Sequence, residues 1–309
     1  MTRVRTIELH GYADCIELEN EHASVVLCPA CGGRVLRYAW RGEDAIALDP
    51  AQAGYLWHPG AREIDPWGGR FDVGPEKTIA PHPILWLGPW SKEVGPGGVV
   101  GLRSAPDPAT GLQVVRTFSL DPRSSHLRCE QTVTNLSGEP RSFCHWGRTM
   151  TPGGGIVIVP FTPGSRFPRG YVQYHTTRTE LLDFAPNDPN VRARDGFLEV
   201  VGPLEHPKLG FDSTAGWMAY LEPSGLLFVK RWPVFPDRAY AELAAITLSI
   251  WLYRDRFCEL EPIGPAERLG PGASASLAED WWLLPHPFPP RRDRLDLPAV
   301  AQRVAREAQ

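Results

Sequence analysis

Two acids near the end of the chain are the residues best placed by type and spacing to do chemistry. Glu259 and Glu261 lie in the segment 257–265, which is expected to be a strand that ends at a proline-rich turn. Side chains alternate along a strand, so Phe257, Glu259 and Glu261 share one face. Such acids are either solvated or held in a cleft where their basicity can be used. The segment alone does not decide whether the acids are solvated or held in a cleft. It also does not decide which of the two would be the base.

A second candidate group lies in the segment 142–155. It places His145 and Trp146 ahead of a turn rich in glycine. An imidazole and an indole at the mouth of such a turn suit a polar ligand with apolar faces, such as a sugar. The alternative is a histidine of the core or its rim that bonds to a backbone carbonyl.

A third candidate group lies in the segment 66–90, which is rich in Pro and Gly and carries Arg70, His82 and Trp86. We interpret it as a long loop, and long loops of this kind are often functional. The alternative is a surface loop whose tryptophans only cover the core.

The elements that must position these residues are expected to be strands. The 309 residues include 30 Gly and 32 Pro, which divide the chain into short segments and favour strands joined by turns. We expect one all-β domain over residues 1–289 and a helical tail over 290–309. The clearest predicted strands are 24–27, 34–40, 98–102, 112–120, 126–134, 155–160, 216–221, 226–232, 245–253 and 276–284.

Composition excludes several classes of partner. The formal net charge of -4 gives no reason to expect nucleic acid or an anionic membrane surface. No apolar run approaches the roughly 18 residues needed to span a bilayer, and the N-terminus lacks the apolar run of a signal peptide, so we expect a cytoplasmic protein. Six cysteines, only two of them close together (Cys28 and Cys31), fit reduced thiols better than a metal site. We therefore expect no metal and no cofactor.

Taken in order, these segments resemble the galactose mutarotase-like superfamily. The segment 19–27, followed by Gly32-Gly33-Arg34 and a further apolar strand, is similar to the opening strands of that family. His145 and the segment 258–262 fall in the order and approximate spacing of the family's catalytic histidine and Leu-Glu motif. The resemblance covers roughly residues 15–285. It implies an antiparallel β-supersandwich, two large sheets packed on each other, with a sugar cleft on one concave face.

The resemblance also implies roles for individual residues. Glu261 resembles the general base and His145 the general acid of a cofactor-free aldose 1-epimerase, whose substrate is a small carbohydrate. Arg70 and His82 resemble substrate-binding residues of that family. Trp86 and Trp146 are expected to stack on the sugar, with Glu259 beside it as a further binding residue.

Two departures from the family pattern separate this chain from its best-known branches. Aldose 1-epimerases usually follow the acid histidine with an aromatic-Phe-Asn run, whereas His145 precedes Trp146-Gly147-Arg148. The hexose-phosphate branch has an arginine shortly after its first histidine, and the residues after His82 include none, which disfavours a phosphorylated sugar. The fold is therefore expected to transfer better than the reaction.

Three functions remain open at this point. The first is an isomerase that interconverts sugar anomers, the second a carbohydrate-binding protein without chemistry, and the third a sugar lyase or hydrolase in the same cleft. The isomerase requires Glu261 and His145 to face one cavity, whereas a binding protein tolerates either pointing away. A lyase or hydrolase requires a further Tyr, Lys or carboxylate near Glu261, and Glu259 is the candidate that the sequence offers.

Overall fold

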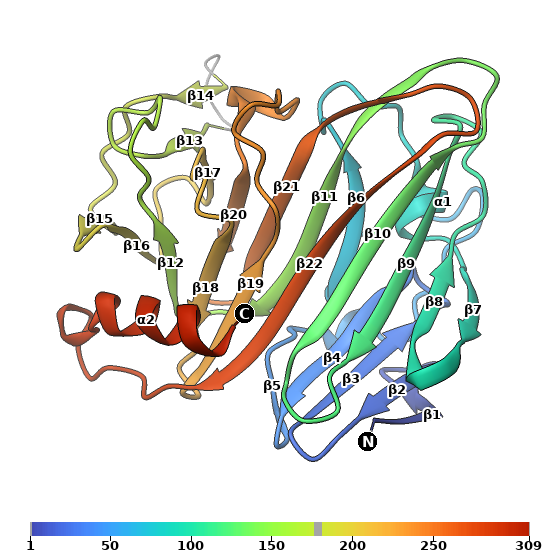
Figure 1. Cartoon of the computed structure of the whole chain (residues 1–309), viewed down its shortest axis with the longest axis horizontal. Helices are drawn as coiled ribbons and strands as arrows, with labels where there is room; N and C mark the ends of the chain where they lie inside the picture. Colours follow the sequence, from blue (N-terminus) through green and yellow to red (C-terminus); the bar gives the residue numbers. More distant parts are fainter. Residues whose placement is uncertain (1, 176–180, 309) are drawn as a thin grey trace.

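Two antiparallel β-sheets pack face to face in the computed structural model, which describes residues 2–175 and 181–308 (Figure 1). The first sheet has twelve described strands, in the order β1 (Arg3–Leu9), β2 (Tyr12–Glu19), β3 (Ala23–Cys28), β4 (Arg34–Trp40), β6 (Gly69–Gly74), β11 (Arg141–Pro152), β21 (Phe257–Leu269), β20 (Leu248–Tyr253), β17 (Lys208–Phe211), β13 (Val172–Tyr174) and β14 (Leu182–Asp183), with β5 (Glu43–Asp44) beside β4.

The second sheet has ten strands among the described residues. Their order is β15 (Val191–Arg194), β16 (Phe197–Val201), β12 (Ile156–Pro160), β18 (Trp217–Leu221), β19 (Leu226–Arg231), β22 (Ser274–Pro285), β10 (Leu127–Asn135), β9 (Leu112–Leu120), β8 (Val100–Arg103) and β7 (Ser91–Val94). The main apolar core lies between the two sheets and draws on strands of both. The prediction of an all-β antiparallel sandwich is confirmed.

The two sheets differ in how their outer faces are used. Along β9 in the ten-stranded sheet, every second residue is buried and the residues between are partly exposed, which is the pattern of a strand with one solvated face. In the twelve-stranded sheet, β11 and the first nine residues of β21 are almost wholly buried on both faces. Polar side chains on the outer face of these strands are therefore largely removed from bulk water.

The structure differs from expectation in two segments. The segment 66–90, expected to be a long loop, contains β6, all of whose residues are buried. In the segment 142–155, His145 and Trp146 lie within strand β11, which continues to Pro152 before the expected glycine-rich turn begins. Backbone pairing of β11 with both β6 and β21 explains the difference, because it satisfies the polar groups of a glycine-containing stretch that lacks a strong strand pattern of its own.

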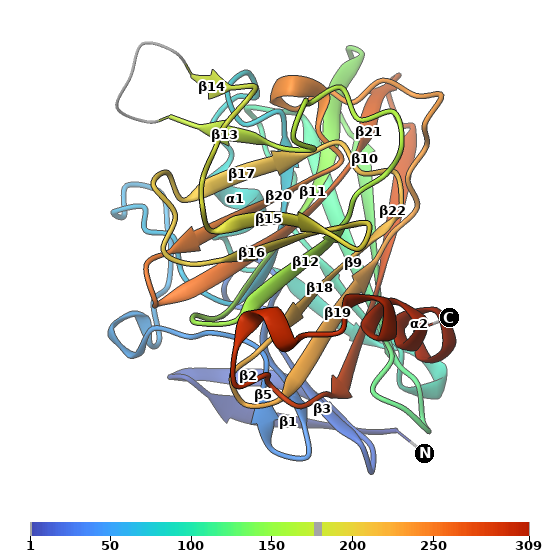
Figure 2. The ribbon, with the colours of Figure 1, turned by 90° about the vertical axis from the view of Figure 1, so that its left-hand side faces the viewer.

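The C-terminal tail forms α2 (Leu297–Glu307), as predicted, whereas α1 (Pro83–Trp86) is a single short turn. The Asp296 side chain caps α2 by accepting a hydrogen bond from the Ala299 N–H at 2.9 Å. Leu297, Val300 and Val304 pack on the outer face of the ten-stranded sheet, over β12, β18, β19 and β22 (Figure 2). Neither of these helices is long and apolar enough to cross a bilayer.

A buried ion pair lies in the largely apolar space between the sheets. Lys230 Nζ, on β19, lies 2.9 Å from Glu279 Oε2, on β22. The same ammonium group donates to Thr149 Oγ1 at 3.0 Å and to the Leu260 carbonyl at 3.3 Å, both on the opposite sheet. Opposite Glu279, β11 has Gly147, where a Cβ would lie only 2.0 Å from Glu279 Oε1. The absence of a side chain at Gly147 therefore makes room for the ion pair.

Replacing Lys230 with Met should destabilise the fold strongly, because it leaves the Glu279 carboxylate buried without its cation. The expected loss in the free energy of unfolding is about 3–5 kcal/mol, measured by urea denaturation. In the double variant Lys230→Met/Glu279→Gln both members of the ion pair are neutral, and a large part of the loss should be recovered. A loss below about 1 kcal/mol in the single variant would contradict this account.

Candidate active site

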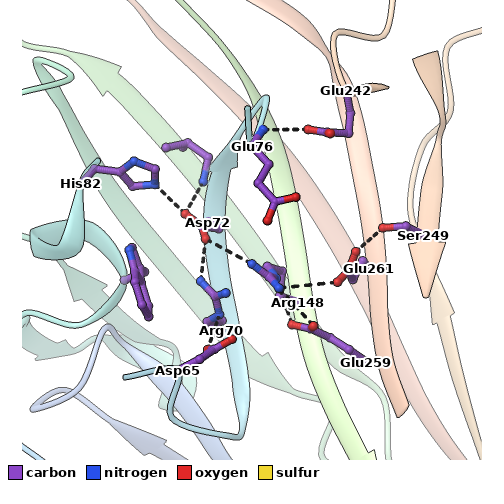
Figure 3. Close-up of polar contacts among 12 residues, drawn as sticks. Asp65, Arg70, Asp72, Glu76, His82, Arg148, Glu242, Ser249, Glu259 and Glu261 are labelled. Atoms are coloured by element: carbon purple, nitrogen blue, oxygen red, sulfur yellow. Dashed lines mark hydrogen bonds and ion pairs between the residues drawn. The ribbon is translucent and has the colours of Figure 1, made fainter. Parts of the chain in front are cut away.

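The candidate site lies on the outer face of the twelve-stranded sheet, where β6 supplies Arg70 and Asp72 (Figure 3). These two residues alternate with Phe71 and Val73, which point into the core between the sheets. Arg70 Nη1 donates to Asp72 Oδ2 at 2.5 Å, and Arg70 Nε lies 3.4 Å from Asp65 Oδ1. The Arg70 guanidinium also lies over the half-buried indole of Trp86, 4.6 Å from the ring centre.

His82, just before α1, is fixed by two hydrogen bonds. Its Nε2 lies 2.7 Å from Asp72 Oδ1 and its Nδ1 lies 2.6 Å from the Ala80 carbonyl oxygen. Burial alone would lower the pKa of His82, but the hydrogen bond and charge of Asp72 outweigh it, so the pKa is raised. For Asp72, burial is outweighed by Arg70, His82 and Arg148, and the carboxyl pKa is lowered. The pair is therefore an imidazolium and a carboxylate.

Arg148 on β11 joins the acids of β6 and β21. Its guanidinium makes a bidentate contact with Glu259, Nε to Oε1 at 2.9 Å and Nη2 to Oε2 at 3.1 Å. It also lies 3.8 Å from Asp72 Oδ2 and 3.7 Å from Glu261 Oε1. Glu259 and Glu261 are both fully buried and share one strand face, as side-chain alternation predicted (Figure 3).

The two acids of β21 differ in their surroundings. For Glu259, burial exceeds the opposing effect of Arg148, and with the nearby Glu261 charge it raises the pKa. Burial would raise the pKa of Glu261 too, but Lys208 and Arg148 outweigh it and the pKa is lowered. Ser249 Oγ donates to Glu261 Oε2, whereas Glu261 Oε1 accepts no hydrogen bond within the described part of the chain. Glu261 is thus the acid whose pKa is lowered, and its Oε1, 3.7 Å from Arg148 Nη2, is left without a hydrogen bond from the described residues.

Lys208 and Tyr174 border the site from strands further along the same sheet. Lys208 Nζ lies 3.9 Å from Glu261 Oε2 and 3.3 Å from Glu76 Oε2. The ammonium group also lies over two rings, 4.9 Å from the ring centre of Trp146 and 5.3 Å from that of Tyr174. Sequence reasoning missed both residues, because neither lies in a segment that carries another candidate group.

Asp72 and Arg148 were also missed, but their signal was present. Each lies two positions after a candidate residue, Asp72 after Arg70 and Arg148 after Trp146. A residue two positions along a strand shares its neighbour's face. Had β6 and β11 been recognised as strands, alternation would have placed both charges in the site.

The structure gathers six of the seven predicted site residues and leaves out His145. The six are Arg70, His82, Trp86, Trp146, Glu259 and Glu261. His145 lies on the opposite face of β11, between the sheets, with its ring centre 5.3 Å from that of Phe143. Its Nε2 lies 3.2 Å from the carbonyl oxygen of Ala275 on β22. The expectation that His145 and Glu261 face one cavity is therefore wrong, because neighbouring residues of a strand point to opposite faces.

Burial of the His145 imidazole lowers its pKa to about 4. The imidazole is therefore neutral near pH 7 and acts as a polar group of the core. Within residues 2–175 and 181–308, no cluster of three or more His, Cys, Asp or Glu side chains is arranged to hold a metal ion. The acids of the site are matched instead by arginine, lysine and histidine.

Solved structures share this fold across most of their length. A galactose mutarotase-like protein from Lactobacillus casei superposes with a TM-score of 0.60 at 13% identity, covering 87% of this chain and 100% of that one. The Slr1438 protein from Synechocystis superposes with a TM-score of 0.59 at 16% identity, covering 91% of this chain and 99% of that one. A galactose mutarotase related enzyme from Lactobacillus acidophilus superposes with a TM-score of 0.53 at 13% identity, covering 92% of this chain and 98% of that one.

These similarities establish the fold of the chain. No protein-family model matches the sequence, and no curated protein matches it either. Identities of 13–16% support a shared architecture and carry no information on the reaction. The chain thus has the galactose mutarotase-like fold, and the resemblance of its sequence motifs to that superfamily is confirmed at the level of fold.

The two histidines should titrate in opposite directions in an NMR titration of the imidazole signals. His82 should titrate above the usual value near 6.5 because Asp72 holds its proton, and His145 near 4 because it is buried. His82 therefore contributes stability that is fully present below pH 6.5 and is lost as the pH rises through its folded pKa. His145 has the opposite effect. In the unfolded chain it binds a proton near pH 6.5, whereas in the folded chain it does so only near pH 4, so stability falls as the pH drops below 6.5.

The variant Asp72→Asn provides the control for this titration. It removes the carboxylate charge from His82 but leaves His145 untouched, so only the His82 signal should move to lower pH. A His145 that titrates near 6.5 would contradict the burial described above.

Proposed function

We propose that this protein binds a neutral sugar at the outer face of the twelve-stranded sheet and interconverts its anomers, with Glu261 as the general base. The observation that carries the proposal is the state of that carboxylate. It is buried, its pKa is lowered by Lys208 and Arg148 against the effect of burial, and its Oε1 accepts no hydrogen bond among the described residues. An ionised carboxylate with an oxygen that accepts no hydrogen bond is able to take a proton from a hydroxyl group.

The chemistry needs two proton transfers and no cofactor. Glu261 removes the proton of the C1 hydroxyl, the bond between C1 and the ring oxygen breaks, and a second group delivers a proton to the ring oxygen. Rotation about the C1–C2 bond and the reverse steps give the other anomer. Arg148 holds the neighbouring Glu259 in a bidentate contact, which keeps the floor of the site fixed during these steps.

Charge at the edge of the site favours an uncharged sugar. The Asp65 and Glu76 carboxylates at this edge are each 38% exposed. Glu76 Oε2 faces Lys208 at 3.3 Å, whose side chain is 17% exposed, and Lys77 at 4.0 Å, whose side chain is 53% exposed. A phosphorylated or acidic sugar would approach two carboxylates, and like charges at close range repel. A neutral aldose avoids this cost.

The placement of His145 favours a second candidate function, sugar binding without chemistry. The acid that the family resemblance implied lies on the wrong face of β11, and a binding protein tolerates that.

A lyase or hydrolase requires a further Tyr, Lys or carboxylate near Glu261, and Tyr174, Lys208 and Glu259 all lie near it. However, Glu259 and Glu261 lie side by side on one strand and share Arg148, whereas a hydrolase needs two carboxyl groups that flank the scissile bond.

Replacing Glu261 with Gln should lower the rate of anomer exchange by about a hundredfold or more while sugar binding survives, because the shape is kept and the basicity is lost. The rate is measured by NMR exchange spectroscopy on a panel of neutral aldoses, and binding by titration calorimetry. His145→Gln is the matched control and should keep its rate within a few fold. Full activity in Glu261→Gln would refute Glu261 as the base. Sugar binding without exchange by the wild-type protein would leave the binding function in its place.

A further inference from the structure

We propose that Lys208 is the proton donor that completes the reaction, in the role that the resemblance had given to His145. This inference rests on the proposed function and names the second catalytic group of the same site. Lys208 begins β17, which is separated from Glu261 on β21 only by β20. Its Nζ lies 3.9 Å from Glu261 Oε2, so the ammonium group lies beside the proposed base.

The surroundings of Lys208 keep its ammonium group in place without using all of its protons. The side chain lies against the faces of Trp146 and Tyr174 and has Glu76 Oε2 at 3.3 Å. An ammonium group has three N–H donors that rotate together. With one donor directed at Glu76, others remain for a ligand bound next to Glu261.

Three buried polar atoms around Lys208 have no hydrogen-bond partner among the described residues. They are Trp146 Nε1, the Tyr174 hydroxyl and Glu261 Oε1, and each side chain is at least nine-tenths buried. Leaving such groups buried and unpaired is unfavourable, so a bound partner that satisfies them is favoured. Sugar hydroxyls both donate and accept hydrogen bonds, and can pair with the indole N–H, the phenol and the carboxylate oxygen together. The unpaired atoms thus locate the ligand next to Lys208.

The other proton-bearing groups of the site are less suited to the role. Glu259 has a raised pKa, but both of its oxygens are engaged by Arg148. Both ring nitrogens of His82 are engaged, one with Asp72 and one with Ala80. Arg70 and Arg148 are guanidinium groups, which do not give up a proton in proteins. Burial, reinforced by Glu242 and Glu261, raises the pKa of Tyr174, so its phenol releases a proton less readily than an ordinary tyrosine.

The step balances without any further reactant. Glu261 takes the C1 hydroxyl proton as the C1 carbonyl forms, the bond between C1 and the ring oxygen breaks, and the Lys208 ammonium protonates that oxygen. Ring closure then returns one proton from the sugar hydroxyl to the Lys208 amine and one from Glu261 to the new C1 hydroxyl. No electron is exchanged, and both side chains end as they began.

The test compares Lys208→Arg, Lys208→Met and Lys208→Cys in anomer exchange on a neutral aldose that the wild-type protein converts. Arginine keeps the positive charge beside Glu261 but cannot act as an acid, so Lys208→Arg should lose about a hundredfold or more in kcat, as should Lys208→Met. Binding of the aldose to Lys208→Arg should stay within a few fold. Treating Lys208→Cys with 2-bromoethylamine restores an amine at nearly the original position and should recover activity. The wild-type protein, treated in parallel, controls for reaction at its own buried cysteines.

The outcomes separate this inference from the function on which it rests. If the wild-type protein exchanges anomers and Glu261→Gln does not, but Lys208→Arg keeps its rate, Lys208 acts only by its charge and the inference is overturned while the function stands. Loss of activity in Tyr174→Phe together with a normal rate in Lys208→Arg would assign the proton to Tyr174 instead. If the wild-type protein exchanges no aldose, the function fails and the inference fails with it.

Discussion

The ion pair between Lys230 and Glu279 is the interaction on which the arrangement of the site depends. Its ammonium group bonds across the gap between the sheets to Thr149 and to the Leu260 carbonyl, and so joins β19 and β22 to β11 and β21. A buried ion pair adds little net stability, because desolvation offsets much of the attraction, but it penalises any register that separates the charges. Here it fixes which faces of β11 and β21 point into the core.

The residues of the site lie on the outward faces of β11 and β21. With Thr149 and Gly147 turned toward the ion pair, alternation turns Trp146 and Arg148 outward. On β21 the Leu260 side chain packs in the apolar core, and alternation turns both acids outward. Arg148 then meets Glu259 and Glu261 across the paired strands, and Asp72 from β6 on its other side. The charged network outside the sheet and the ion pair inside it are therefore two consequences of one register.

The parts of this arrangement that the sequence predicted are those governed by local rules. Strands such as 34–40 and 112–120 follow from apolar pattern and turn residues, and the shared face of Glu259 and Glu261 follows from alternation within one strand. The sequence could not predict which strands pair with one another when they lie far apart in the chain. β6 was hidden because its Gly and Pro neighbours resemble a loop, although neighbouring strands satisfy its backbone. Lys208 meets Glu261 only because β20 aligns β17 with β21, which no local pattern encodes.

His145 shows why a fold can transfer when the residues of a site do not. A motif that is one position out of phase in a strand moves the side chain to the other face, although its place in the chain order is almost unchanged. In this chain, the outward positions of that part of β11 hold an indole and a guanidinium, and neither can deliver a proton to a sugar. Any acid–base chemistry at Glu261 must therefore take its proton from another strand. Across β20 from Glu261, β17 presents an ammonium group beside the carboxylate, so the proposed chemistry draws its proton from β17 and not from β11.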